Sequence, residues 1–416
     1  MAAPPSSAPV PGTAEHIDPV RDWTESGIVS LTGRADGPPV LPPGIAATRA
    51  RELSRHIAAA SGVVVDGARI LAERAAFTGH TRNGATSVGG SCRLLATVDG
   101  WAAVSCARPD DPVLLGALIS EDITGDPWPQ VRQWLNGHSG TELAERAELL
   151  GIAAAPVRVP SEPPPLPRLG MPRSVKDLLV VDFSALWAGP LCAHLLGLAG
   201  ARVVKVETPT RPDGARSGNA EFYALLHGGH SSVVLDPQTA GGRHALAGLV
   251  RAADIVIEAS RPRALAGFGL DAEAEVARGC TWISITANGR DSDRIGFGDD
   301  IAASSGLVAR DTDDAPLFVG DAIADPLTGL TAAALAMSAG SDDGNLWDLS
   351  MTNVVASTLH GGAAALPRRQ DGYWVLDCDT GVARVEAPRP REPHGAVSES
   401  GADTAAVLGR LGIALP

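Results

Sequence analysis

The chain has 416 residues, a formal net charge of −14 at pH 7, and a composition that is 44% hydrophobic and 20% charged. This balance is typical of a folded globular protein and argues against wholesale disorder. The excess of negative charge argues against nucleic acid or an anionic membrane as the main partner. The length exceeds what a single hydrophobic core usually serves, so two or three domains are expected.

The cysteines and the N-terminus indicate the cellular setting. The five cysteines form no C-x-x-C pair, and an odd number fits free thiols in a reducing cytoplasm better than a disulfide framework. Residues 1–20 are rich in Pro, Ser and Ala and lack the basic and apolar regions of a signal peptide, so a disordered tail is expected. Because no segment approaches about 18 uninterrupted apolar residues, no membrane span is expected.

Residues 21–154 are predicted to form an N-terminal half. Its expected elements are, in order, a turn-rich segment (21–46), a helical region (46–75), a Gly/Ser loop (84–91), a β-hairpin (93–107) and further helices (110–153). The hairpin is expected because two apolar runs flank Asp99-Gly100, a dipeptide typical of tight turns between antiparallel strands. A linker over 155–174 follows, in which seven of twenty residues are proline. Such a segment is stiff and extended, which favours a domain boundary there.

The stretch Leu178–Glu207 opens a second module, which is predicted to run over 175–416. An apolar run is followed by a turn, a helical pattern that opens at Gly189-Pro190 and ends at Gly200, and a second, β-branched run. This strand–turn–helix–strand order has about the 30 residues that a right-handed βαβ unit needs. Backbone N–H groups at the start of such a helix lie beside the end of the first strand, where phosphorylated ligands bind.

Further strands and helices alternate after this unit. Strands are predicted over 232–235, 254–258, 281–286 and 346–351, helices over 240–252, 301–308, 327–337 and 403–411, and a hairpin over 371–386. Alternation of elements at these lengths favours a mostly parallel sheet that is covered by helices. The predicted fold class is therefore α/β.

Two segments of the N-terminal half are echoed in the second module. Ser26-Gly27-Ile28-Val29 resembles Ser305-Gly306-Leu307-Val308, and Asp99-Gly100-Trp101 resembles Asp371-Gly372-Tyr373-Trp374. The echoes favour a relationship between the two modules, although matches this short also arise by chance.

Four blocks of the second module resemble the family III CoA-transferases, the group that includes formyl-CoA transferase, carnitine CoA-transferase and α-methylacyl-CoA racemase. The blocks are AGPLCAHLLGLAGARVVKVETP (188–209), SSVVLDPQTAGGRHAL with ADIVIEASRP (231–262), ITANG (285–289), and DDIAASSGL with IADPLTGLTAA (299–333). The N-terminal half resembles a second and more diverged copy, through its Trp23–Gly33 stretch and its Asp99–Val104 hairpin.

This resemblance implies a fold, an assembly and a substrate class. It implies a Rossmann-like parallel sheet in a large domain, a smaller α+β domain, and an interlaced homodimer in which each chain threads through the other. It implies no permanently bound cofactor, because coenzyme A enters as an acyl-CoA substrate and a carboxylic acid accepts it.

The resemblance also implies that Asp325, followed by Pro326, is the nucleophile. A carboxylate can attack an acyl-CoA thioester to form a mixed anhydride, and the released thiolate can then form an enzyme-bound CoA thioester, which passes CoA to an acceptor acid. Taken from the residues alone, Asp before Pro favours a helix N-cap. The two roles are compatible, because a helix N-terminus is expected to keep this carboxylate ionised.

The N-terminal half offers an internal comparison for this position. Twenty residues separate Ser305 from Asp325, and the same offset from Ser26 leads to Ala46. That half has no equivalent carboxylate, so it is expected to be scaffold or substrate wall.

The resemblance implies five CoA-binding residues, namely Trp187, Ala188, Gly189, Arg216 and Arg261. Small residues at 188 and 189 let a pantetheine arm approach backbone N–H groups, but they equally serve tight packing of a helix on a strand. Thr208 and Gly267 depart from the family's basic or polar positions, and loss of cations weakens phosphate binding. No histidine spacing is typical of a metal site, so none is predicted.

The leading hypothesis is thus an acyl-CoA:carboxylate CoA-transferase that uses Asp325. An acyl-CoA racemase of the same fold is one alternative, but Asp299 stands where the racemases carry histidine, and Asp299-Asp300 also fits a plain surface loop. A catalytically degenerate homologue, which binds acyl-CoA or only a partner subunit, is the second alternative. A nicotinamide dehydrogenase is remote, because Glu207 ends the second strand but no G-x-G-x-x-G occurs.

Overall fold

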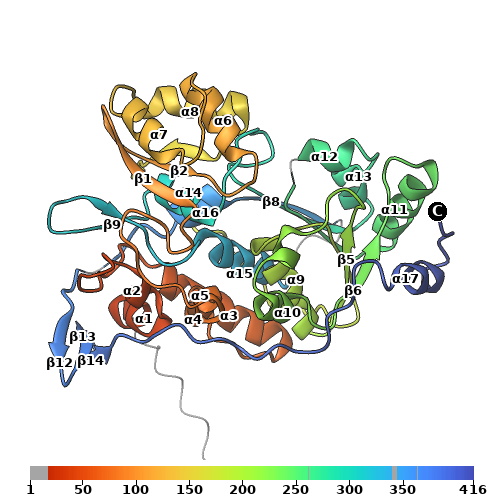
Figure 1. The fold of residues 1–416 in the computed structure, drawn as a ribbon. Coiled ribbons are helices and arrows are strands. Elements are labelled where there is room, and N and C mark those ends of the chain that lie inside the picture. Colours follow the sequence, from red (N-terminus) through yellow and green to blue (C-terminus); the bar gives the residue numbers. More distant parts are fainter. Residues whose placement is uncertain (1–16, 261, 340–343, 363) are drawn as a thin grey trace, which may run out of the picture.

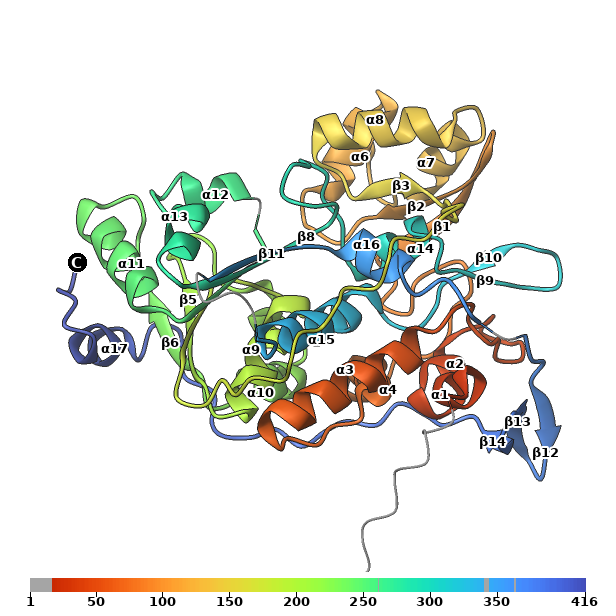
Figure 2. The ribbon, with the colours of Figure 1, turned by 180° about the vertical axis from the view of Figure 1, so that it is seen from behind.

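The computed structural model describes residues 17–260, 262–339, 344–362 and 364–416, which form three packed parts (Figure 1). The largest is a parallel sheet with helices on both faces. A smaller sheet, covered by its own helices, lies beside one end of the large sheet, and the N-terminal helices pack beneath both (Figures 1 and 2). Within the described residues, no helix is both long enough and apolar enough to cross a membrane.

Six parallel strands form the central sheet, in the order β11-β8-β7-β4-β5-β6. Their bounds are β4 (Leu179–Asp182), β5 (Arg202–Glu207), β6 (Ser231–Val234), β7 (Ile255–Glu258), β8 (Thr281–Thr286) and β11 (Asn345–Ser350). Counted along the chain, this is the 3-2-1-4-5-6 order of a doubly wound Rossmann sheet. The predicted parallel α/β sheet is confirmed, and the strand order reverses between β4 and β7, where such folds bind ligands.

Helices cover both faces of this sheet. They are α9 (Ala188–Leu198), η1 (Gly214–Ser217), α10 (Ala220–His227), α11 (Ala240–Ala252), α12 (Pro262–Ala266), α13 (Ala272–Ala277), α15 (Ala324–Ala336), α16 (Met351–Ala356) and α17 (Thr404–Arg410). Because successive strand residues face opposite sides, Val180, Ile255 and Ile283 join a core with α9 and α15. Val181 and Val256 join a second core with α11 and α17. Burial on both faces explains the continuous apolar runs of these strands.

The N-terminal helices share the first of these cores. They are α1 (Pro19–Ser26), α2 (Ile28–Leu31), α3 (Ala46–Ser61), α4 (Gly67–Ile70) and α5 (Glu73–Thr78). The helical region expected over 46–75 is three helices, because Gly62 takes the left-handed conformation (φ 78°) and ends α3. Helix α1 begins inside the stretch expected to be a tail, since the Asp18 side chain accepts a hydrogen bond from Arg21 N (3.0 Å) and caps it. Residues 1–16 of that stretch lie outside the described part.

The smaller sheet is antiparallel. It contains β1 (Cys92–Thr97), β2 (Gly100–Ser105) and β3 (Ala154–Pro156), and α6 (Asp111–Ile119), α7 (Trp128–Leu135) and α8 (Gly140–Leu150) cover it. The predicted hairpin is confirmed, with Thr97 opposite Gly100 across the turn. Strand β3 adds the first residues of the proline-rich segment to this sheet. Further along that segment, Met171 O accepts a hydrogen bond from Ala339 N (2.7 Å), which ties it to the end of α15.

The remaining elements frame the large domain. They are α14 (Gly298–Ser304), β9 (Ala309–Arg310), β10 (Pro316–Leu317), β12 (Arg368–Gln370), β13 (Tyr373–Cys378) and β14 (Gly381–Arg384). The hairpin expected over 371–386 is confirmed as β13 and β14, and β12 adds a third strand. The echoed glycines Gly27 and Gly306 share the left-handed conformation, with φ of 92° and 97°.

Candidate functional site

Four aspartates gather where the start of α14 meets the start of α15. Asp299 and Asp300 lie in the first turn of α14, Asp321 precedes α15, and Asp325 lies in its first turn. The surface loop considered for Asp299-Asp300 is wrong, because these residues are only 7% and 3% exposed. The helix expected over 301–308 instead starts at Gly298, so Asp299 and Asp300 both lie within it.

Asp325 is the second residue of α15 and does not cap it. Ile323 holds the N-cap position and makes no side-chain capping bond. The N-cap interpretation of Asp325 is therefore wrong, and its carboxylate is directed to other groups. Its backbone N–H donates to Ala322 O (2.9 Å), in a tight turn where Ala322 itself has a positive φ of 47°.

Gly298 forms the floor beneath the Asp325 carboxylate. A Cβ at this position would overlap Asp325 Oδ2 and Ala322 O, and would lie 2.6 Å from Ala322 Cβ. Only a residue without a side chain leaves room for the carboxylate here. The glycine stands in the GFGDD segment, but its role depends on a contact with a residue that follows it by 27 positions (325 − 298), so sequence reasoning missed it.

Arg74 brings the N-terminal half into the site. Its guanidinium forms a two-pronged ion pair with Asp321, through Nε to Oδ2 (2.9 Å) and Nη2 to Oδ1. Its Cζ also lies 4.9 Å from the ring centroid of Trp187, in a cation–π contact. Helix α5 is thus connected to the turn before α15 and to the turn before α9. The N-terminal half was expected to be scaffold or substrate wall, and no sequence pattern singled out Arg74.

Burial and mutual repulsion raise the pKa of most carboxyl groups in the cluster. Burial, helped by Asp299 and Asp321, raises the pKa of Asp325 to about 7, against the opposing effects of Arg74 and the Gly298 N–H. Burial raises the pKa of Asp299 to about 6 and that of Asp300 to about 7. Burial acts on Asp321 too, but the Arg74 charge outweighs it and lowers the pKa to about 2. The helix N-terminus therefore does not keep the pKa of Asp325 in the usual low range of a carboxyl group, and near neutral pH this group is ionised only in part.

Asp299 shares the turn that holds Asp325. Its Oδ1 accepts a hydrogen bond from Ala322 N (2.8 Å), so one residue, Ala322, bonds to both aspartates. A hydrogen bond from the Ser87 side chain and the charge of Arg74 also favour the ionised form of Asp299. The pair is therefore coupled, and protonation of one aspartate favours ionisation of the other.

The raised pKa of Asp325 predicts how the Asp325→Asn substitution changes stability with pH. A carboxyl whose pKa is higher in the folded than in the unfolded chain binds more protons when folded, so stability falls as pH rises from about 4 to about 7. The variant removes that titration from the pair. We expect its free energy of unfolding to exceed that of the wild type by on the order of 1–2 kcal/mol at pH 8, with no gain at pH 4. Urea unfolding at the two pH values measures this, and an equal effect at both would contradict it.

Trp187, Ala188 and Gly189 lie at the start of α9, at the end of the loop that follows β4. Trp187 is 2% exposed and Ala188 is 5% exposed. A Cβ at Gly189 would overlap the Ser184 side chain, so this glycine serves close packing of the helix on the strand loop. The alternative of tight packing is confirmed for Gly189, and contact of the three residues with CoA stays a prediction.

Arg216 and Arg261, the two predicted CoA-binding cations, differ in what the structure describes. The Arg216 guanidinium is held by Glu207, with Nε to Oε1 at 2.9 Å and Nη2 to Oε2 at 2.5 Å, and it stacks over the Tyr223 ring at 5.1 Å. A phosphate would therefore compete with a carboxylate for it. Arg261 lies outside the described residues. Of the two arginines, the structure therefore places only Arg216.

A buried charge network lies next to these residues. Lys205 Nζ is 3.0 Å from Asp213 Oδ2 and 3.7 Å from Asp182 Oδ2, and it also contacts Ser184 O. Burial, followed by the charge of Lys205, lowers the pKa of His227 and lowers that of His230 to about 4. Both histidines are thus buried and neutral at physiological pH. This network fixes the loop over the β4–β5 edge and leaves Lys205 paired.

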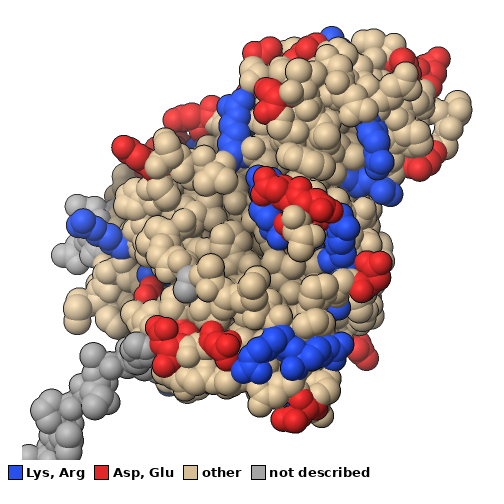
Figure 3. Space-filling view, turned by 90° about the vertical axis from the view of Figure 1, so that its left-hand side faces the viewer, with Lys and Arg blue, Asp and Glu red and all other residues tan. Residues whose placement is uncertain are grey.

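Two further features bear on binding partners, namely the surface charge and the grouping of possible metal ligands. Figure 3 shows acidic and basic side chains in small mixed groups on the face that it draws, without one broad patch of basic residues. Among the residues that the structure describes, no three His, Cys, Asp or Glu side chains are grouped to hold a metal ion.

The match to a known family lies in the second module of the chain. CoA-transferase family III matches residues 175–370. The succinate–glutarate CoA-transferase of Agrobacterium fabrum is 28% identical over 226 residues, which cover 48% of this chain and 54% of that protein. The succinyl-CoA–D-citramalate CoA-transferase of Chloroflexus aurantiacus is 31% identical over 182 residues, which cover 40% of this chain and 45% of that protein. The match thus spans about half the length of these curated relatives.

Solved structures resemble part of the chain. A CaiB/BaiF family protein from Brucella suis is 25% identical, with a TM-score of 0.43 over 51% of this chain and 65% of that chain. The fold itself is established by the strand order and by the parallel pairing of the large sheet. Over residues 175–370, this chain thus matches CoA-transferase family III, the family that its sequence blocks resemble.

Proposed function

We propose that this protein is an acyl-CoA:carboxylate CoA-transferase in which Asp325 is the nucleophile. The Asp325 carboxylate attacks the thioester carbonyl, the C–S bond breaks, and CoA leaves as a thiolate while a mixed anhydride forms. The thiolate attacks the aspartyl carbonyl of the anhydride, and the donor acid leaves as its carboxylate. The acceptor carboxylate attacks the resulting aspartyl thioester and expels CoA. The thiolate then attacks the acceptor carbonyl, which releases the new acyl-CoA and free Asp325.

The position of Asp325 is the observation that carries this proposal. The carboxylate lies in the first turn of α15, against Gly298 and close to the Arg74–Asp321 ion pair. A pKa near 7 leaves an ionised fraction of Asp325 large enough to attack the thioester at neutral pH. The mechanism needs no metal or resident cofactor, because the thioester supplies the driving force.

The relatives support transfer between acids, since those matched are named as transferases that act on succinate, glutarate, citramalate, formyl-CoA and oxalate. The crevice between β4 and β7 is the expected place for CoA, beside Trp187, Ala188 and Gly189. Arg216 and Arg261 remain the proposed phosphate contacts. Arg216 would serve by exchanging Glu207 for a phosphate, so CoA affinity is expected to be modest.

The proposal includes a homodimer, interlaced as the family resemblance implies, and a cytoplasmic location. The N-terminal half already supplies Arg74 to Asp321 within one chain. Light scattering on the purified protein measures the mass in solution. A monomer that transfers CoA at full rate would contradict the dimer without affecting the chemistry.

The decisive experiment traps the covalent intermediate on the full-length chain. The protein is incubated with a panel of acyl-CoAs and then with hydroxylamine, and the peptide that contains Asp325 is examined by mass spectrometry. A hydroxamate on Asp325 is expected, with none in Asp325→Asn. An exposed aspartate offers the matched control, so Asp36→Asn should form the adduct as the wild type does.

Other results of this experiment identify the alternatives. No adduct together with no CoA binding would contradict the enzyme proposal and favour a degenerate homologue. Exchange of the substrate's α-proton with solvent deuterium, without CoA transfer, would favour a racemase, in which Asp299 and Asp325 would move the proton.

A further inference from the structure

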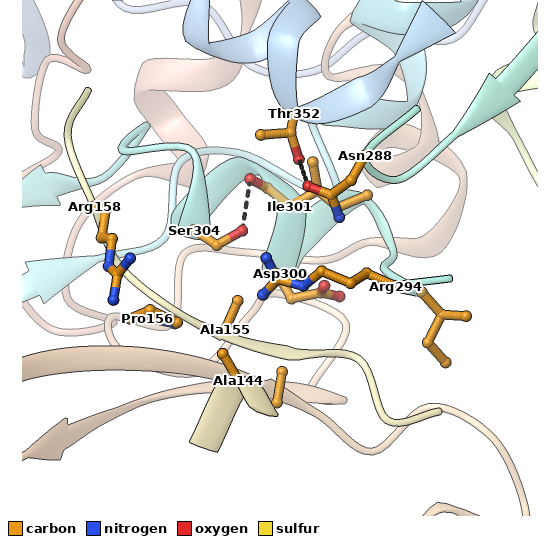
Figure 4. A pocket seen from close by; sticks show the side chains of 12 residues that line it. Ala144, Ala155, Pro156, Arg158, Asn288, Arg294, Asp300, Ile301, Ser304 and Thr352 are labelled. Carbon is orange, nitrogen blue, oxygen red and sulfur yellow. Dashed lines mark hydrogen bonds between the residues drawn. The ribbon is translucent and has the colours of Figure 1, made fainter. Parts of the chain in front are cut away.

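A pocket opens at the carboxyl edge of the large sheet, between the two sheet-containing parts (Figure 4). Asn288 follows β8, and Thr352 lies in the first turn of α16, directly after β11. Ala144, Ala155 and Pro156 of the smaller part form the opposite wall. Ligands of doubly wound folds bind along this edge of the sheet. The position is therefore suited to a substrate and lies away from the β4–β7 crevice.

The pocket has room for a small organic acid. Its volume is about 120 Å³, which holds several water molecules or a small organic acid. An acyl-CoA is far larger than this. A ligand that fits the pocket has few heavy atoms, so strong polar contacts must supply its affinity.

The side chains that face the pocket are mainly hydrogen-bond donors. Figure 4 shows Arg294 extending into its centre and Arg158 at its other end. In the described part of the chain, the Arg294 guanidinium makes no ion pair with Asp or Glu, and the Arg158 guanidinium donates one hydrogen bond, to Thr141 Oγ1 (2.9 Å). Thr352 Oγ1 donates to Asn288 Oδ1 (3.0 Å), so the Asn288 amide N–H₂ remains to donate. Two guanidinium groups and an amide suit a carboxylate.

Of the described residues that line the pocket, only Asp300 is acidic, and its carboxylate is already hydrogen-bonded. Its Oδ1 accepts hydrogen bonds from Ser105 Oγ (2.8 Å) and from Phe297 N (2.9 Å). Its Oδ2 is turned toward Gly296. Because burial raises its pKa to about 7, this residue is half protonated near neutral pH and opposes an anion only in part. The net character of the lining is cationic.

The pocket and Asp325 lie on neighbouring sides of one helical turn. Asp300 and Ile301 line the pocket, whereas Gly298, in the same turn of α14, contacts the Asp325 carboxylate. One α-helical turn rises about 5.4 Å, so the part of α14 that lines the pocket is close to the part that contacts the nucleophile.

We propose that this pocket binds the acceptor, and that the acceptor is a short dicarboxylic acid whose remote carboxylate is anchored by Arg294, with Arg158 as a second cation at the rim. This inference rests on the proposed CoA transfer to a carboxylate. The free carboxylate of the acid attacks the carbonyl carbon of the Asp325–CoA thioester, the C–S bond breaks, and CoA thiolate leaves. The thiolate then attacks the acceptor carbonyl and releases Asp325 as a carboxylate. A fork of donors on a planar anion explains why arginine occupies both positions.

Calorimetric titration of the full-length protein, without CoA, tests the pocket directly. The probes are succinate and glutarate, with butyrate and pentanoate as monocarboxylates of the same chain lengths. We expect the dicarboxylates to bind at least about tenfold more tightly, because they alone carry a second anion. Arg294→Gln should lose about tenfold in dicarboxylate affinity, whereas Asp300→Asn, which keeps Oδ1 as an acceptor and removes the charge, should gain affinity. Arg132→Gln, an exposed arginine on α7 outside the lining, should bind as the wild type does.

Equal binding of the two acid classes, or dicarboxylate affinity unchanged in Arg294→Gln, would overturn the proposal. If Arg294→Gln does not fold, the gain in Asp300→Asn and the loss in Arg158→Gln keep the test open. Failure of the pocket is distinguishable from failure of the transferase function. Arg294→Gln should still form the Asp325 hydroxamate from the acyl-CoA donor, with only the acceptor KM raised. An absent hydroxamate beside Arg294-dependent dicarboxylate binding would contradict the transferase step and leave the pocket in place.

Discussion

Replacing Arg74 with glutamine is expected to slow formation of the Asp325 adduct about a hundredfold and to lower the free energy of unfolding by about 3 kcal/mol. Asp321 is fully buried, and the variant leaves its charge without a partner. The turn that joins Asp321 to Asp325 then loses its fixed position. Arg74 also lowers the pKa of Asp325, so its removal should move the pH midpoint of adduct formation upward from about 7. Single-turnover trapping across pH and urea unfolding measure the two effects.

The pH midpoint separates a role in the site from a role in folding alone. The double variant Arg74→Gln/Asp321→Asn removes both charges, so it should recover much of the lost stability but not the adduct rate. Arg69→Gln breaks a more exposed ion pair with Asp66 on the same part of the chain and should change stability by less than about 1 kcal/mol. Arg74→Gln with an unchanged rate and an unchanged midpoint would show that Arg74 only supports the fold.

Replacing Gly298 with alanine is expected to abolish most adduct formation, with a loss of about a hundredfold or more. The added methyl group would occupy the space of Asp325 Oδ2 and Ala322 O, so the carboxylate must move away from its position. Overpacking of this kind also lowers stability, by about 1–3 kcal/mol. Hydroxylamine trapping measures the rate, and thermal unfolding shows whether the variant is folded at the assay temperature.

A second glycine provides the matched control for this substitution. Gly409 lies in α17, has no heavy atom within 4 Å of an added Cβ, and does not have a left-handed φ. Gly409→Ala should therefore leave the adduct rate unchanged and stabilise the protein by about 0.5–1 kcal/mol. If Gly298→Ala forms the adduct at the wild-type rate while it remains folded, the carboxylate is not confined as the geometry indicates.

Sequence patterns located the secondary structure of the large domain closely. The helix over 240–252 and the strand over 281–286 have the predicted bounds, because their apolar spacing and their flanking turn residues agree. The bounds were wrong where a local signal was weak or a single residue decided. Gly62 ends α3 through its left-handed backbone, and α14 begins three residues before the predicted helix. Both differences come from backbone geometry at an element's end.

Only one residue of the candidate site, Asp325, was predictable from the sequence. Asp325 stands in a segment that resembles the family, so its part in the chemistry was proposed from the sequence. The pKa of Asp325 was not predictable, because burial and the neighbouring aspartates raise it. Which residues surround the carboxylate is decided by the tertiary structure. Arg74 and Gly298 could not be found either. Each acts on a residue distant in the chain, and neither lies in a spacing typical of a site.

The sequence by itself determined that this protein is an α/β protein with a parallel sheet, a βαβ unit over Leu178–Glu207 and an aspartate in a family III segment. Periodicity and turn residues act locally, so they can be recognised along the chain. Only the tertiary structure decided that the N-terminal half supplies Arg74 to the site, that the pKa of Asp325 lies near 7, and that two arginines face one pocket. These properties arise from through-space contacts and burial, which no stretch of sequence contains.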